Sequence, residues 1–171
     1  MQEKETTNPP DFLDVFRVPA EGRLVALDPG TKRLGVAVSD ELQITTRAVK
    51  TIERTGWKKL LLQIKEILEQ FDAVGLVIGL PYNFDGSESE MSQEARRLAR
   101  NFALSLKIPV LLQDERATTY EAKGRLWREG VSDKEFRARV DNEAAAIILS
   151  DFIARRNELS IKNRSNFNQS D

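Results

Sequence analysis

The sequence contains no histidine and no cysteine among its 171 residues. Without histidine, hydrolysis by a Ser-His-Asp or Cys-His arrangement is excluded, and so are zinc sites built on imidazole. Without cysteine there are no disulfides, thiolate metal sites or cysteine nucleophiles. Hydrolytic chemistry is left to carboxylates, Lys, Tyr, Ser or Thr, or to a metal ion held by oxygen ligands, which suits Mg²⁺ or Mn²⁺.

Long hydrophobic runs and a strong charge imbalance are also missing. No apolar run approaches the ~20 residues that a membrane span needs. The opening residues, MQEKETTNPPDF, have neither the basic nor the apolar region of a secretory signal. The formal net charge of −1 gives no general attraction to nucleic acid, although a local basic face would suffice. We therefore expect a cytoplasmic protein with no membrane partner.

The distribution of apolar residues predicts one folded domain between two polar flanks. Residues 1–21 carry three of the prolines and predict a flexible N-terminal arm. Residues 22–157 contain the apolar runs and form the expected domain. Residues 158–171 are polar and predict a flexible C-terminal tail.

Five apolar runs predict strands, and helical periodicity predicts the segments between them. The first two strands flank a Pro-Gly turn and form a hairpin, with the third strand pairing beside the second. The fourth is almost entirely apolar, which is typical of a strand buried on both faces. Helices are expected over 57–71, from Met91 to Leu106, from Thr118 to about Gly130, and over 140–157. Ser132 gives a further helix start signal. The expected strands are 23–28, 34–39, 45–52, 73–81 and 108–115.

This order of elements predicts an α/β fold. Three antiparallel strands followed by two parallel ones make a mixed five-stranded sheet with helices on both faces. That arrangement is the ribonuclease H-like (RNase H-like) architecture.

Carboxylates stand at the ends of two of the predicted strands. Asp28 ends the first strand, and Asp114 and Glu115 end the fifth. Ligands of open α/β sheets gather at the carboxyl ends of parallel strands, so these acids converge if the first, fourth and fifth strands are neighbours. Asp141, at the expected start of the last helix, can project toward the same edge. Crowded carboxylates repel one another unless a cation lies between them, and such a cluster can hold two divalent ions for phosphoryl displacement.

Each of these acids also has a simpler explanation. Asp28 suits the first position of a tight turn, and Asp141 suits the N-cap of a helix. Glu115 can form a surface ion pair with Arg116 or Lys123. The hypothesis of a metal site therefore depends on the topology that brings several acids together.

Four segments of the chain together resemble the YqgF family, also called RuvX: ALDPGTKRLGVAVSD, VIGLPYNFDGSESE, PVLLQDERATTYEA and VDNEAAAIIL. The resemblance runs in order over residues 23–155. It implies an RNase H-like fold similar to RuvC resolvases and a nuclease that hydrolyses phosphodiester bonds. The implied role is 5′-end maturation of pre-16S rRNA in ribosome biogenesis, Holliday junction resolution, or both. The implied partner is precursor rRNA or branched DNA, the cofactor is Mg²⁺ or Mn²⁺, and the protein is a monomer or homodimer.

The resemblance also assigns roles to individual residues. It makes Asp28, Glu115 and Asp141 the catalytic, metal-binding triad, with Asp114 as a further metal ligand that can be confused with Glu115. Asn142 departs mildly from the family pattern, which more often has a small hydroxyl residue there. The implied substrate-binding residues are Gly30, Thr31 and Lys32 in the first turn, Asn83 in the loop after the fourth strand, and Arg116 and Thr119 after the fifth.

Basic residues gather on the predicted helix after the fourth strand and in the segment after the fifth, but acids are interleaved with them, so a balanced helix surface is the simpler explanation. Two other function classes stay open. One is a non-catalytic nucleic-acid-binding module of the same fold. The other is an actin-like ATPase or sugar kinase, which also opens with an Asp-x-Gly-Thr turn; the chain is short for two lobes and lacks a P-loop. The basic residues are Arg96, Arg97, Arg100, Lys123, Arg125, Arg128, Lys134, Arg137 and Arg139.

Overall fold

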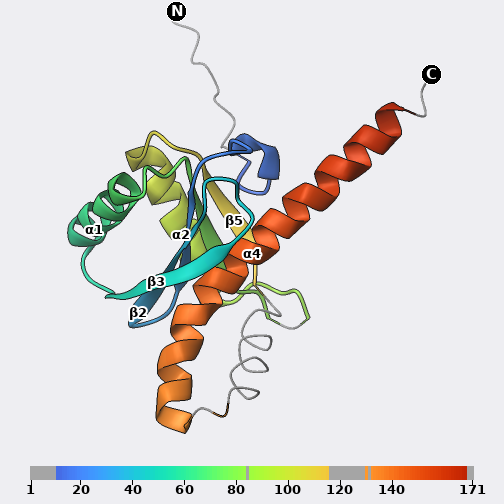
Figure 1. The fold of residues 1–171 in the computed structure, drawn as a ribbon. Coiled ribbons are helices and arrows are strands. Elements are labelled where there is room, and N and C mark those ends of the chain that lie inside the picture. The colour runs from blue at the N-terminus through green and yellow to red at the C-terminus, as the bar shows by residue number, and fades with distance from the viewer. Residues whose placement is uncertain (1–10, 84, 116–129, 131, 169–171) are drawn as a thin grey trace, which may run out of the picture.

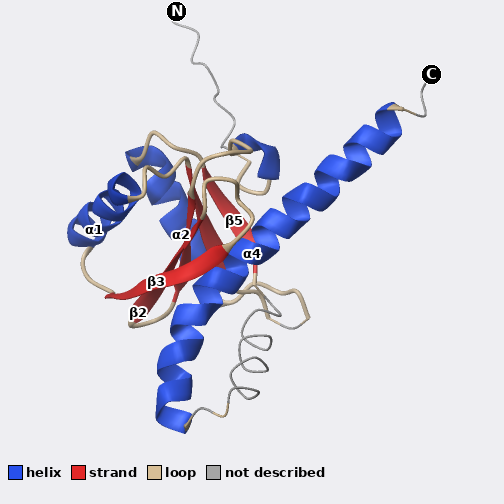
Figure 2. Cartoon of the chain, viewed as in Figure 1, coloured by secondary structure: helices blue, strands red, loops and turns tan. Residues whose placement is uncertain are grey.

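Strands and helices follow one another in the predicted order as far as the fifth strand (Figures 1 and 2). The computed structural model describes residues 11–83, 85–115, 130 and 132–168, with backbone alone over 133–142. The predicted helix from Thr118 lies outside the described residues. The elements are η1 (Val15–Arg17), β1 (Leu24–Pro29), β2 (Arg33–Ser39), β3 (Thr46–Glu53), α1 (Trp57–Gln70), β4 (Gly75–Leu80), α2 (Glu90–Ser105), β5 (Val110–Asp114) and α4 (Asp133–Phe167).

The strands form one five-stranded sheet in the order β3-β2-β1-β4-β5. The pairs β1–β2 and β2–β3 are antiparallel, whereas β1–β4 and β4–β5 are parallel. This topology confirms the predicted mixed sheet of RNase H-like type. It also makes β1, β4 and β5 neighbours, which is the condition for the acids at their ends to meet.

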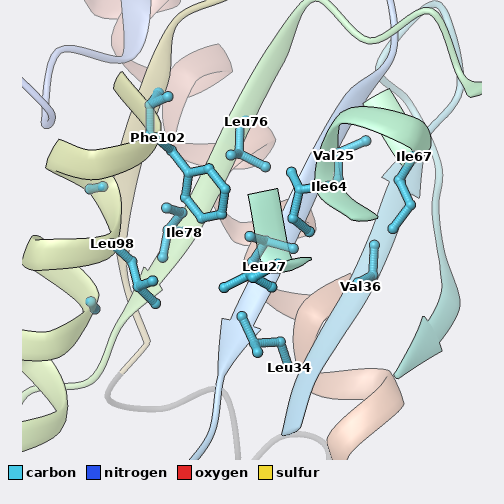
Figure 3. Packing of buried hydrophobic residues seen from close by; sticks show 14 of the residues in the cluster. Val25, Leu27, Leu34, Val36, Ile64, Ile67, Leu76, Ile78, Leu98 and Phe102 are labelled. Atoms are coloured by element: carbon cyan, nitrogen blue, oxygen red, sulfur yellow. The ribbon is translucent and has the colours of Figure 1, made fainter. Parts of the chain in front are cut away.

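Alternate residues of the strands supply two hydrophobic cores, one on each face of the sheet. The larger core lies between the sheet and helices α1 and α2, and Figure 3 shows side chains such as Leu27, Ile64 and Phe102 meeting there. On the opposite face, Ala26 and Val77 belong to the core under α4 (Figure 1). Because side chains alternate along a strand, the side chain of Asp28, two residues after Ala26, points to the α4 face of the sheet.

The last helix differs from the prediction. Instead of a separate helix over 140–157 and a flexible tail from residue 158, α4 is continuous from Asp133 to Phe167. The tail was mispredicted because its residues are polar and carry no apolar stripe, yet they contain no glycine or proline to end a helix. Lys162 donates to Glu158 at 2.9 Å one turn away, which supports the helix locally. No helix in the described residues is long and apolar enough to cross a membrane.

Part of the expected N-terminal arm packs against the domain. Val15 and Val18 are only 3% and 4% exposed and belong to the core under α4. Arg156 of α4 donates to the carbonyl oxygen of Pro19 at 3.2 Å. Residues 11–21 are therefore tied to α4 rather than free of it, a contact between distant segments that local composition does not reveal.

Candidate active site

Asp28 is held near the end of β1 between two residues that have no side chain. It pairs with Gly35 of β2 across the antiparallel ladder. On the other side, Leu27 pairs with Ile78 of β4, so the next position in that parallel register places Gly79 level with Asp28. Glycines on both sides leave open the space around a partly buried carboxyl group.

Glu115 reaches the same face from β5. Gly79 pairs with Gln113, and the backbone N–H of Glu115 donates to the carbonyl oxygen of Leu80 at 3.2 Å, which continues the ladder past the end of the strand. Glu115 lies two residues after Gln113 and so leaves the strand on the α4 face with Asp28. The carboxyl groups of Glu115 and Asp28 are hydrogen-bonded to each other.

A hydrogen bond between two carboxyl groups requires a proton on one of them. Burial of Glu115, followed by the charge of Asp28, the hydrogen bond to it and the charge of Asp114, raises the pKa of Glu115 to about 9. In the protein without a bound metal at neutral pH, the two carboxyl groups therefore share one proton.

The neighbouring acid, Asp114, lies on the other face of the sheet. It pairs with Leu80, whose side chain belongs to the core under α1 and α2. Its charge still acts on Glu115 and contributes to the raised pKa of that group. The structure thus brings Asp28 together with Glu115, while Asp114 is a neighbour of the pair from the opposite face.

The predicted turn forms a small pocket beside Asp28. Its volume is about 240 Å³. Thr31 and Lys32 are exposed, and the N–H of Gly30 donates to the carbonyl oxygen of Arg33 at 2.8 Å. A Cβ atom at Gly30 would lie 2.6 Å from that same oxygen, so glycine is needed to close the turn. The pocket is lined by Asp28, Gly30, Thr31, Lys32, Arg33 and Gly35.

Arg54 anchors this turn and was not identified from the sequence. Its guanidinium donates to the carbonyl oxygen of Gly30 at 3.1 Å. Its backbone N–H donates to the carbonyl oxygen of Lys32 at 2.8 Å. Its side chain also forms an ion pair with Glu94 of α2. Glu94 in turn binds Arg97 at 2.7 Å. No local sequence signal marks Arg54, because its partners lie in the first turn and in α2.

The loop after β4 is organised by its own polar side chains. The side-chain amide of Asn83 donates to the hydroxyl oxygen of Ser87 at 2.9 Å and to the carbonyl oxygen of Glu88 at 3.4 Å. The hydroxyl of Ser89, which caps α2, donates to the carbonyl oxygen of Pro81 at 2.9 Å. The contacts of Asn83 therefore shape the loop.

The other predicted residues are placed less completely. Asp141 lies well inside α4, because the helix begins at Asp133, so the alternative that Asp141 caps the helix is wrong. The side chain of Asp141 lies outside the described residues, as do Arg116 and Thr119 entirely. In the described part of the chain, no group of three His, Cys, Asp or Glu side chains suited to a metal ion occurs.

Comparison with known proteins identifies the family. A model of the RuvX family, described as Holliday junction resolvase, matches residues 22–155. A relative from Anaeromyxobacter dehalogenans (strain 2CP-C), named "Putative pre-16S rRNA nuclease", is 41% identical over 134 residues, which are 78% of this chain and 98% of the relative. A relative of the same name from Novosphingobium aromaticivorans is 44% identical over 128 residues, 75% of this chain and 82% of the relative. This chain belongs to the RuvX family.

Membership of the RuvX family confirms the enzyme class expected from the sequence, a nuclease that hydrolyses phosphodiester bonds. It favours this class over a non-catalytic module and over an actin-like ATPase. Among solved structures, T. thermophilus RuvC in complex with Holliday junction substrate is 14% identical, with a TM-score of 0.49 over 80% of this chain and 96% of that one.

The basic side chains that this RuvX-family chain presents on α2 are largely neutralised by acids. Arg96 donates to Glu88 at 2.9 Å, and Arg97 binds Glu94. The side chains of the later basic residues, from Lys123 to Arg139, lie outside the described residues. In the described part, the balanced helix surface is thus the better explanation of these arginines.

Proposed function

We propose that this chain is a divalent-metal-dependent nuclease that matures the 5′ end of precursor 16S ribosomal RNA. The observation that carries the proposal is the hydrogen-bonded carboxyl pair of Asp28 and Glu115 at neighbouring carboxyl ends of the sheet. The proposed substrate follows from the names of the relatives, one of which is matched over 98% of its own length.

The donors at this pair fit Mg²⁺ or Mn²⁺. Both ions prefer hard oxygen ligands, and a divalent cation would take the place of the proton that Asp28 and Glu115 share. Gln113 supplies a second indication, since its Oε1 atom is buried with no hydrogen-bond partner among the described residues. Gln113 leaves β5 on the same face as Glu115, so its free acceptor suits ordered water around a cation.

We assign the third ligand position to Asp141. It lies four residues before Ala145 and seven before Ile148, both of which are buried residues of α4. Helical periodicity puts these three positions on one stripe of the helix. A bound ion would supply Lewis-acid activation of water and charge neutralisation at the scissile phosphate.

The chain's own residues would bind and orient the nucleic acid. Lys32 places a positive charge at the pocket beside Asp28, and Thr31 places a hydroxyl group there. Gly30 has no side chain, so a phosphate can approach the backbone of the turn. Arg116 and Thr119 would contact the substrate from the segment after β5, and Asn83 would hold the loop that forms the opposite wall.

The proposal is tested by incubating the purified protein with a 5′-extended precursor 16S rRNA fragment and, separately, with a four-way DNA junction. Each substrate is assayed with Mg²⁺, with Mn²⁺ and with EDTA. Cleavage of the rRNA precursor that requires the metal supports the proposal. Tight binding of either substrate without cleavage under any condition would contradict it.

Holliday junction resolution is a second candidate because the matching family model carries that description. A resolvase has to cut two strands symmetrically, which a homodimer with two equivalent sites achieves. Paired incisions in the junction would favour this activity if the protein is also a dimer. Light scattering after gel filtration measures its oligomeric state. An rRNA end can be processed by a monomer.

Arg54→Gln is expected to lower kcat/KM for cleavage about tenfold, because the turn beside Asp28 loses a charge-assisted hydrogen bond to Gly30 and its link to Glu94. The matched control is Arg97→Gln, which removes the other arginine bound to Glu94 without touching the turn. Initial rates at several substrate concentrations measure both variants. Equal kcat/KM values for the two variants would contradict a role of Arg54 in holding the turn.

A further inference from the structure

The two carboxyl groups of the candidate site come from strands that are not adjacent. Asp28 lies on β1 and Glu115 follows β5, with β4 between them. Neighbouring strands lie about 4.8 Å apart, so the backbones of β1 and β5 are separated by about 10 Å. The carboxyl groups can meet only by reaching over β4.

Gly79 is the β4 residue over which they meet. It pairs with Gln113 of β5, and the register between β1 and β4 brings it level with Asp28. A Cβ atom built on Gly79 would lie 2.6 Å from Oε2 and 3.0 Å from Cδ of Glu115. The Glu115 carboxyl group therefore occupies the volume that any side chain at position 79 would need.

The surroundings of Gly79 differ from those of the other glycine in β4. A Cβ atom at Gly75 would meet only aliphatic side chains, those of Val18 and Leu24, at 2.7 and 3.0 Å. Glycine inside a strand weakens the strand, and it marks places where another group approaches closely. At Gly79 the approaching group is a carboxyl group of the site.

We propose that Gly79 is a positioning residue, whose missing side chain lets the carboxyl group of Glu115 cross β4 and meet that of Asp28, so that both can bind one divalent cation. This inference rests on the proposed function. It predicts that a methyl group at position 79 separates the two carboxyl groups without removing either.

One other contact at Gly79 has to be separated from this effect. The same Cβ atom would lie 2.6 Å from Cδ1 of Ile148 in α4. Ile148→Val removes that atom and leaves the Glu115 contact unchanged. The double variant Gly79→Ala with Ile148→Val therefore keeps the steric overlap with Glu115 but removes the overlap with the core residue Ile148.

The test measures Mn²⁺ binding by isothermal titration calorimetry, together with thermal unfolding and cleavage of the rRNA precursor. Gly79→Ala is expected to weaken Mn²⁺ binding about 10–100-fold, in the range found when groups that orient metal ligands are removed. Ile148→Val alone should bind Mn²⁺ like the wild type. The double variant should regain thermal stability relative to Gly79→Ala but not its Mn²⁺ affinity.

A shorter acid at position 115 should relieve the overlap with a methyl group at position 79. Glu115→Asp withdraws the carboxyl group from position 79, so adding it to Gly79→Ala should cost less Mn²⁺ affinity than adding it to the wild type. Wild-type Mn²⁺ affinity in Gly79→Ala, or its recovery by Ile148→Val, would overturn the role of Gly79 while leaving the proposed function intact. A wild-type protein that binds no Mn²⁺ would overturn both.

Discussion

Asp28→Asn is expected to reduce metal-dependent cleavage of the rRNA precursor about 1,000-fold while leaving the fold intact, because the interactions of a metal ion with the reacting groups contribute several kcal/mol. Asparagine keeps the size of aspartate and can still bond to Glu115, so the sheet and its cores should not change. It removes the negative charge that holds a divalent ion. Single-turnover rates with saturating Mg²⁺ measure the effect.

The matched control is Asp40→Asn at the opposite end of the sheet. Asp40 accepts hydrogen bonds from the backbone N–H groups of Ile44 and Thr45 at 2.7 and 2.8 Å, and an asparagine side chain can accept the same bonds. This variant should cleave at the wild-type rate. Wild-type cleavage by Asp28→Asn as well would show that Asp28 is only a turn residue.

Glu115→Gln is expected to stabilise the metal-free protein above neutral pH. The pKa of Glu115 is raised from 4.5 to about 9 in the folded protein. Unfolding releases its proton at any pH between these two values, so its contribution to stability is fully present below about pH 4.5 and is lost as the pH rises toward 9. Glutamine donates to Asp28 without a titrating proton. At pH 8 the variant should therefore gain up to about 5 kcal/mol in free energy of unfolding.

Urea unfolding in EDTA at pH 4, 6 and 8 measures this effect, and the difference between variant and wild type should grow with pH. Mg²⁺ should raise the melting temperature of the wild type more than that of Glu115→Gln, because a ligand stabilises only the protein that binds it. Glu158→Gln is the control, since Glu158 is an exposed acid bound to Lys162 and away from the site. A variant that is less stable than the wild type at pH 8 would contradict the protonated pair.

The sequence by itself determined the elements of the sheet and the chemistry available to it. Strand alternation and helical periodicity are local patterns, so they predicted β4 as a fully buried strand and α1 to within one residue of its end. The absence of histidine and cysteine left hydrolysis to carboxylates, Lys, Tyr, Ser or Thr, or to a metal ion held by oxygen ligands. The predicted elements also indicated that Asp28 and the acids ending the fifth strand would converge if the first, fourth and fifth strands were neighbours.

Only the tertiary structure decided which groups meet. The choice of Glu115 over Asp114 depends on the register of β5 against β4, and a shift of one residue reverses which face a side chain takes. The space over Gly79 and the anchoring of the first turn by Arg54 depend on contacts between segments far apart in the chain. The continuation of α4 through polar residues to Phe167 likewise has no apolar periodicity that would predict a helix. Local composition reports burial and periodicity, whereas these features depend on the distances between strands and helices once they have packed.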